Sequence, residues 1–299
     1  MPTGSPYIPI NLVGQIFWPV YVGVVPPYKA CFLDLQLLTI CLLTFAINFV
    51  GALAYAARIA GVRTQRIALA FALFNVLVLL SRLSNGFLGP FLAKRIESAL
   101  LADSGDGLLF DFRLVLAAAT AASVLGTLFI PTAQRWFSRA IADFQHHRSV
   151  LTLVKVAASP RGLAFLWRAG TRPRASHLRG LCGLHGVGLS VIALNVLAQA
   201  LLGVGVLASL YAGYLVPEYR VTASQLSAIV NGFATILLFV LIDPQLSVMT
   251  DDVVSGSVGE GVFRRTVVLL ALSRVCGTVL AQVLFVPAAW LVVACAHLM

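Results

Sequence analysis

Charged side chains are scarce in this chain. Only 11% of its 299 residues are Asp, Glu, Lys or Arg, whereas soluble domains carry about 25%. Hydrophobic residues make up 60%, and the mean hydropathy is +0.94. This shortage of polar side chains excludes an ordinary soluble domain, so lipid must surround most of the chain.

Several chemical motifs are missing as well. None of the five cysteines forms a Cys-x-x-Cys pair, so we expect neither a metal site nor a disulfide framework. The absence of a GxxxxGK[ST] loop argues against ATP hydrolysis, and no cofactor is expected. Residues 1–28 lack an early positive cluster and a clear cleavage site, so no secretory signal is predicted.

The basic residues outnumber the acidic ones, which gives a formal net charge of +10. Most of the positive charge lies in loops between apolar runs. Membrane topology and anionic phospholipid account for such charge, so nucleic acid is not an expected partner.

Six apolar runs are each long enough to cross roughly 30 Å of hydrocarbon as a helix. They are Leu35–Ala57, Ile67–Ala93, Arg113–Ile130, Val187–Val216, Ser224–Ile242 and Thr266–Cys295. The predicted fold class is therefore an all-α polytopic membrane protein, with a single transmembrane domain over residues 35–299.

Two further segments are expected to lie in the membrane interface. In residues 1–34, an apolar stretch is interrupted by Asn11, Gln15 and Pro19, which favours an interfacial segment over a seventh span. In residues 131–183, apolar side chains alternate with arginines at near-helical spacing, as in amphipathic interfacial helices. This insert could anchor the protein to anionic lipid or collect a lipid-linked anionic substrate.

The distribution of Lys and Arg predicts the orientation. Fourteen of them lie in residues 58–66, 131–183 and 243–265, on one side of a six-span arrangement, and five lie on the other. Because cytoplasmic loops are enriched in these residues, the first side is predicted to be cytoplasmic, with both termini outside.

Arg82 and Arg274 lie inside apolar runs, and each directly follows a serine. A charged side chain at bilayer depth costs about 2.5–3.5 kcal/mol on insertion scales, so both should face a shared polar cavity rather than lipid. Helices one, two, five and six also carry most of the polar side chains. The predicted substrate-binding set is Asn48, Asn75, Ser81, Arg82, Asn85, Ser273, Arg274 and Gln282.

Charges of opposite sign follow the first and the fifth predicted helices. The basic set is Arg58, Arg63 and Arg66, and the acidic set is Asp243, Asp251 and Asp252. On the cytoplasmic side these groups could form a gate that ion pairs close. They could equally cap helices in water.

A loose internal repeat is also suggested. FAINFVGALAYAARIAG aligns with FATILLFVLIDPQLSVM, and the two Ser-Arg runs align with each other, although apolar segments also resemble one another by chance. A repeat relating helices one and two to helices five and six would place a cavity on a pseudo-twofold axis, as in parallel-repeat transporters.

The stretches AYAARIAGVRTQRIALAFALFNVLVLLSRLSN, IDPQLSVMTDDVVSGSV and SRVCGTVLAQVLFVPAAW resemble the Amj family of lipid II flippases, the alternates to MurJ. The resemblance covers Leu37–Phe91 and Ser224–Trp290. It implies a multi-pass protein of the bacterial cytoplasmic membrane that moves lipid II, an undecaprenyl-pyrophosphate-linked disaccharide-pentapeptide, from the inner to the outer leaflet. Peptidoglycan synthesis machinery is an implied partner.

The residues are compatible with such a substrate. Arginine pairs with phosphate in two-point geometry, so Arg82 and Arg274 are candidate pyrophosphate partners, and nearby amides could bond sugars. One alternative is a membrane-embedded enzyme acting on polyprenyl phosphates, with Asp243, Asp251 and Asp252 holding Mg²⁺. The acidic set lacks a repeated DDxxD pattern. A purely structural partner of cell-wall synthases would leave the buried arginines unexplained.

The predicted orientation can be tested by cysteine labelling of intact cells. A single cysteine at position 104 should react with an impermeant reagent added outside, and one at position 172 should not, because the loops that contain them lie on opposite sides. External labelling at position 172 would overturn the orientation.

Overall fold

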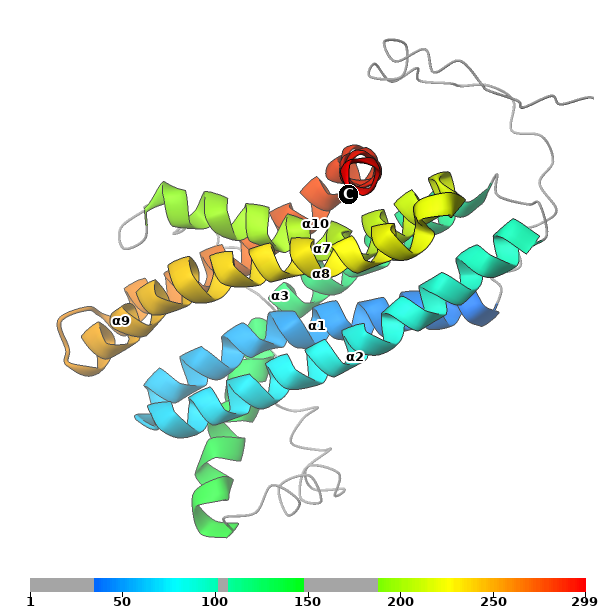
Figure 1. Ribbon diagram of the computed structural model, residues 1–299. Coiled ribbons are helices and arrows are strands. Elements are labelled where there is room, and N and C mark those ends of the chain that lie inside the picture. The colour runs from blue at the N-terminus through cyan, green and yellow to red at the C-terminus, as the bar shows by residue number, and fades with distance from the viewer. Residues whose placement is uncertain (1–34, 102–106, 148–187) are drawn as a thin grey trace, which may run out of the picture. The chain divides into compact units, whose positions relative to one another are not determined.

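Nearly all of the described chain is helical. The computed structural model describes residues 35–101, 107–147 and 188–299, which belong to one compact unit, Leu35–Met299. In chain order the elements are α1 (Leu35–Thr64), α2 (Ile67–Leu101), α3 (Leu108–His147), α7 (Leu189–Leu215), η3 (Pro217–Tyr219), α8 (Arg220–Ile236), the π turn η4 (Leu237–Ile242), α9 (Asp243–Val254) and α10 (Glu260–Leu298) (Figure 1). No strand occurs in these ranges, so the predicted all-α class is confirmed.

Six helical segments are long and apolar enough to cross a membrane. They are α1, α2, α3, α7, the stretch Pro217–Val254 and α10, which confirms the predicted number and order of spans. Residues 1–34 and 148–183, where interfacial segments are predicted, lie outside the described residues.

Two spans extend further than the apolar runs indicate. The third continues through Pro131 to His147 as one helix, so residues 131–147 are an extension of α3. The fifth continues past Ile242, where a loop is predicted, because the π turn η4 leads directly into α9. Pro244 is the second residue of α9 and has no N–H to donate to the preceding turn, and the π turn lies directly before it.

A tight turn makes α1 and α2 antiparallel neighbours. Gln65 adopts a left-handed backbone conformation with φ 56°, and its side-chain amide donates to the carbonyl of Val62 at 3.1 Å. The amide of Arg66 donates to the carbonyl of Gly61 at 3.1 Å. These bonds use carbonyls that the end of α1 would leave without partners.

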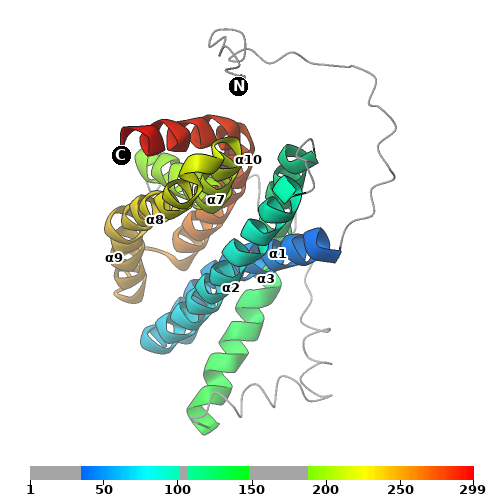
Figure 2. The same ribbon diagram turned by 45° about the vertical axis from the view of Figure 1, so that its right-hand side comes forward.

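The helices form two groups of three spans. In the first helix group, α1 packs along both α2 and α3, which hardly touch each other. In the second helix group, α7 packs along both α8 and α10, which also hardly touch (Figure 2). The groups meet mainly where α10 contacts α3 and α1. Since α1 and α2 pack closely whereas α8 and α10 do not, the predicted repeat of helices one–two and five–six is not confirmed.

Two apolar clusters fill the bundle, one toward each end. The first contains the carboxyl-terminal half of α1 from Leu53 and the amino-terminal part of α10 up to Ala271. The second contains Leu37 and Ile40 of α1 and α10 from Ala281 onward. The helical stretches between the clusters therefore lie near the middle of the bundle, and they carry the polar side chains considered next.

Candidate functional site

Arg274 lies in the middle of α10, between the two apolar clusters. Its Nη1 donates to Oε1 of Gln199 on α7 at 3.0 Å, and its Nη2 donates to Oδ1 of Asn48 on α1 at 3.3 Å. Its Nε is buried and has no hydrogen-bond partner. No carboxylate in the described parts of the chain forms an ion pair with Arg274, so neutral amides alone hold this cation.

Two glycines create the space for this arrangement. A Cβ added at Gly51 on α1 would lie 2.6 Å from Nη2 and 3.0 Å from Cζ of Arg274, so the guanidinium occupies the volume of a missing side chain. A Cβ at Gly277 on α10 would lie 2.6 Å from the Cβ of Gln199 and 2.8 Å from the carbonyl oxygen of Val196. Gly277 thus brings α7 close enough for Gln199 to reach Arg274.

A second buried polar contact supports the same part of α10. The amide nitrogen of Asn195 on α7 donates to Oγ of Ser273 at 2.6 Å and to the carbonyl of Leu270 at 3.1 Å. Asn195 and Ser273 are both buried. Buried hydrogen bonds of this kind fix the rotation of α10 against α7, and they set the direction in which Arg274 points.

The other predicted substrate-binding residues are dispersed. On α2, Ser81 donates to the carbonyl of Ile47 at 3.2 Å, next to Asn48, so Ser81-Arg82 lies at the level of the Arg274 site along α1. Arg82 is exposed, and its Cζ lies 5.2 Å from the centroid of the Phe239 ring in η4. No polar contact described here links Arg82 to Arg274, and their shared cavity stays a prediction.

Asn75, Asn85 and Gln282 do not join the Arg274 cluster either. Asn75 is exposed on α2, and Asn85 is half-buried there. The side-chain amide of Gln282 donates to the carbonyl of Arg113 at 3.2 Å, while the Arg113 guanidinium donates to the backbone carbonyl of Gln282 at 3.4 Å. Gln282 therefore ties α10 to α3, two turns beyond Arg274.

The predicted gate contains one well-formed ion pair. Nη2 of Arg58 lies 2.7 Å from Oδ1 of Asp243, with side-chain exposures of 5% and 27%. The Arg58 guanidinium also lies over the Phe74 ring, 4.3 Å from its centroid, and 5.6 Å from that of Phe71. Such cation–π contacts offset part of the cost of burying the cation. The pair joins α1 to the start of α9, and so joins the two helix groups.

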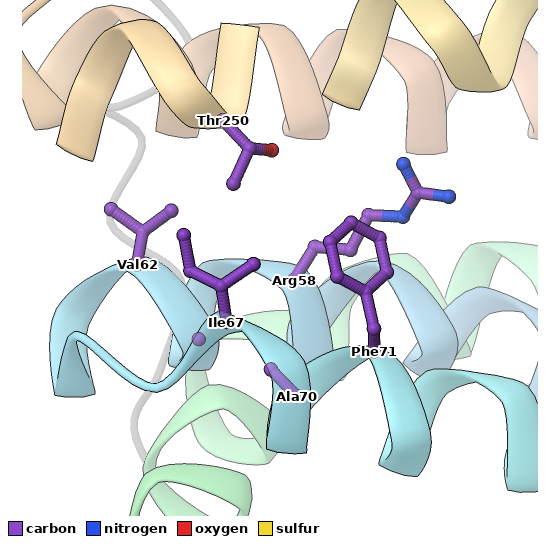
Figure 3. Close-up of a pocket in the computed structure, with 7 residues that line it drawn as sticks. Arg58, Val62, Ile67, Ala70, Phe71 and Thr250 are labelled. Carbon is purple, nitrogen blue, oxygen red and sulfur yellow. The ribbon is translucent and has the colours of Figure 1, made fainter. Parts of the chain in front are cut away.

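A small pocket lies beside Arg58, between α1, α2 and α9 (Figure 3). It has room for about one water molecule. Apart from Arg58 and Thr250, it is lined by Gly61, Val62, Ile67, Ala70 and Phe71. The sticks in Figure 3 show the Arg58 side chain running past the ring of Phe71. Packing between α1 and α9 is therefore incomplete next to the ion pair.

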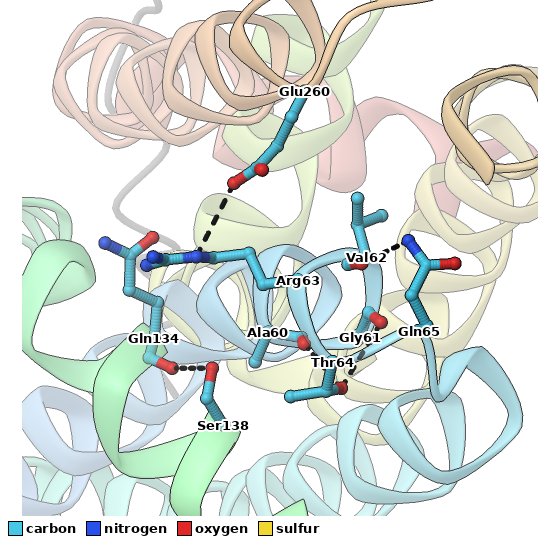
Figure 4. Close-up of polar contacts among 9 residues, drawn as sticks. All are labelled: Ala60, Gly61, Val62, Arg63, Thr64, Gln65, Gln134, Ser138 and Glu260. Carbon is cyan, nitrogen blue, oxygen red and sulfur yellow. Dashed lines mark hydrogen bonds and ion pairs between the residues drawn. The ribbon is translucent and has the colours of Figure 1, made fainter. Parts of the chain in front are cut away.

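The remaining gate residues differ in their exposure and partners. Nε of Arg63 lies 3.5 Å from Oε1 of Glu260 at the start of α10, and both side chains are largely exposed (Figure 4). Arg66 is exposed at the start of α2, Asp251 is exposed on α9, and Asp252 is half-buried. The structure therefore brings Arg58 together with Asp243, and it brings Arg63 together with Glu260, which is not one of the predicted gate residues.

Some residues of the site were not predicted from the sequence. Gln199 and Asn195 carry the two side-chain amides of α7, which is otherwise largely apolar and so gave little sign of a polar site. Gly51 has no side chain that could indicate a role. A recognisable signal is the one-turn spacing of Asn48 and Gly51 on α1, and of Arg274 and Gly277 on α10. Each pair sets a polar side chain beside the gap that a glycine leaves.

The geometry gives no support to a three-carboxylate magnesium site. Among the described residues, no group of three or more His, Cys, Asp or Glu side chains lies close enough to hold a metal ion. Asp243, a member of the proposed metal-binding set, is already paired with Arg58.

Six apolar spans around a cation held by neutral amides define a polytopic membrane protein with a polar site buried between two helix groups. The chain belongs to the Amj family, described as Alternate to MurJ, which matches residues 43–296.

A curated relative supports this membership. The chain is 35% identical over 259 residues to a Bacillus subtilis (strain 168) protein named Lipid II flippase Amj, covering 85% of this chain and 94% of the relative. No solved structure matches the chain.

Removing the carboxylate of the buried ion pair should destabilise the fold. We expect Asp243→Asn to lower the free energy of unfolding by about 2 kcal/mol, because it leaves the buried Arg58 cation without its charged partner. The readout is the thermal unfolding midpoint of the purified protein in detergent. Asp251→Asn, which changes an exposed carboxylate of the same helix, is the control. Equal midpoints for the two variants would refute a stabilising role for this pair.

Proposed function

We propose that this membrane protein is a lipid II flippase, which moves lipid-linked peptidoglycan precursor from the inner to the outer leaflet. Membership of the Amj family and the name of the Bacillus subtilis relative support this function. It is a transport function rather than an enzymatic one. A role alongside the peptidoglycan synthesis machinery is the further partner that we propose.

The observation that carries the proposal is the unpaired charge of Arg274. A guanidinium group is costly in an apolar bundle, and a permanent carboxylate partner would be the simplest way to stabilise it. Arg274 instead has two neutral amides and one buried N–H without a partner. A site of this kind keeps hydrogen-bonding capacity for an anion, and lipid II carries a pyrophosphate between its lipid tail and its sugars.

We infer that the pyrophosphate crosses the membrane by way of Arg274. The guanidinium can form two parallel hydrogen bonds to phosphate oxygens. It lies 14 residues, or roughly 21 Å at 1.5 Å per residue, from the start of α10. We place this position near the middle of the bilayer, where the free energy of an anionic headgroup is highest. A fixed cation there lowers the barrier that the headgroup has to cross.

Ion pairs that link the helix groups at both ends are candidate gates. At one end, Arg58 pairs with Asp243 and Arg63 with Glu260. At the other end, Arg220 at the start of α8 lies 3.5 Å from Glu97 of α2. In the proposed mechanism the ion pairs at the two ends break one after the other. The headgroup then reaches Arg274 from the cytoplasmic side of the membrane and leaves on the opposite side.

The lipid tail has no need of a polar path. One face of α2 exposes large apolar side chains, namely Val76, Leu79, Leu80, Leu83 and Phe87. Apolar side chains at this density suit contact with acyl or isoprenoid chains. Arg82 is exposed on the same helix, where it could meet the phosphate groups while the undecaprenyl chain stays in lipid.

The function is tested by leaflet-specific labelling of lipid II. In cells depleted of their own flippases, expression of this protein should restore lipid II in the outer leaflet, where an impermeant reagent can label it. The same cells should regain growth. Failure to restore outer-leaflet lipid II in cells that contain the protein in their membranes would refute the proposal.

Variants of Arg274 test the proposed substrate contact. We expect Arg274→Gln to abolish the restoration of outer-leaflet lipid II, since it removes the charge, and Arg274→Lys to be partly active, since it keeps the charge but loses the planar fork. Membrane abundance of each variant is measured in parallel by immunoblotting. Full activity of the Gln variant at normal abundance would exclude Arg274 as the pyrophosphate partner.

A further inference from the structure

The two amides that hold Arg274 come from different helix groups. Asn48 belongs to α1 of the first helix group. Gln199 on α7 and Arg274 on α10 both belong to the second helix group. The bond to Asn48, at 3.3 Å, is the longer of the two. Arg274 is therefore held within its own group and linked by a weaker bond to the other.

Both ligands are neutral although their carboxylate counterparts would fit the same space. Asp differs from Asn, and Glu from Gln, by one atom of similar size. A carboxylate at either position would form a charge-assisted bond about twice as strong as the neutral one. A bare cation in an apolar bundle would gain from such a partner, so stability favours an acid at position 199. At position 48 an acid would also lose the bond that the Asn48 amide donates to the carbonyl of Thr44 at 2.9 Å.

Neutral ligands suit a cation that has to change partners. An amide oxygen satisfies a guanidinium N–H at rest, but an oxygen of a negatively charged phosphate group outcompetes it. A carboxylate would compete with phosphate on equal terms and would leave the site electrically neutral before the substrate arrived. The buried, unpartnered Nε of Arg274 adds a donor that the resting contacts do not use.

Gly51 keeps the guanidinium within reach of these two amides. A side chain there would lie within 3.2 Å of Cζ, Nη1 and Nη2 of Arg274, so the cation rests in a recess of α1. Four residues of three helices thus define the resting position of the cation: Asn48, Gly51, Gln199 and Arg274.

We propose that Asn48 and Gln199 are positioning residues that act as exchangeable placeholders for the anionic headgroup, and that their neutrality is required for transport. This inference rests on the proposed flippase function. When a phosphate takes the place of Asn48, the Arg274–Asn48 bond between the two helix groups is released. Substrate binding is in this way coupled to the freedom of the groups to move.

Asn48→Asp and Gln199→Glu separate this role from a structural one. Each variant gives Arg274 a permanent counter-ion. The thermal unfolding midpoint of Gln199→Glu should therefore equal or exceed that of the parent protein, whereas Asn48→Asp also loses the amide bond to the carbonyl of Thr44. Outer-leaflet lipid II, measured by the labelling assay in depleted cells, should fall by about tenfold or more for Gln199→Glu, and it should also fall for Asn48→Asp. A purely structural Arg274 would instead keep transport at the parental level, because its bonds become stronger.

Gln225→Glu is the matched control, because it makes the same amide-to-acid change at an exposed position of α8. It should leave the unfolding midpoint and transport unchanged. Parental transport by Gln199→Glu would overturn the inference, and so would a lowered midpoint of this variant, which would contradict the new ion pair. Transport that survives in Asn48→Asp but fails in Arg274→Gln would reject the placeholder role alone. Absence of transport by the parent protein would reject the function itself.

Discussion

The cost of keeping guanidinium groups inside an apolar helical bundle governs much of this structure. Water cannot solvate these cations at bilayer depth, so each needs a protein ligand or a substrate. Arg58 and Arg274 meet this need in opposite ways. Arg58 has a carboxylate 2.7 Å away and an aromatic ring over its guanidinium, whereas Arg274 has amide oxygens only. The first arrangement is typical of a stable link between helices, and the second of a site that exchanges its ligand.

The placement of these two cations follows from how the helices pack. Apolar clusters fill both ends of the bundle, and the polar contacts of Arg274 occupy the layer between them. Small residues in that layer let three helices approach closely, as is common in membranes where packing rather than hydrophobic burial drives helix association. Both cations bridge the two helix groups, so a charged headgroup that engaged either of them would disturb a contact between the groups.

The sequence predicted the spans well and the polar partners only in part. Apolar runs identify membrane helices because lipid demands them, but helices that continue into water leave no such signal, as the extensions to His147 and Val254 show. Charges of opposite sign follow two spans, so the sequence allowed an ion pair such as Arg58–Asp243, but it allowed helix capping in water equally well. Gln199 was missed as a ligand of Arg274, because its role arises from the close contact at Gly277, which only the folded packing brings about.

The π turn η4 rotates α9 about the helix axis relative to α8, within the fifth span. An α-helix turns by about 100° per residue, and a π turn accommodates one extra residue, so α9 is rotated by about that angle relative to an unbroken continuation of α8. As a result α8 lies along α7, while the residue directly after the turn, Asp243, reaches Arg58 on α1. Deleting a single residue from Leu237–Ile242 would turn Asp243 and Thr250 away from α1 together, although neither side chain had been altered.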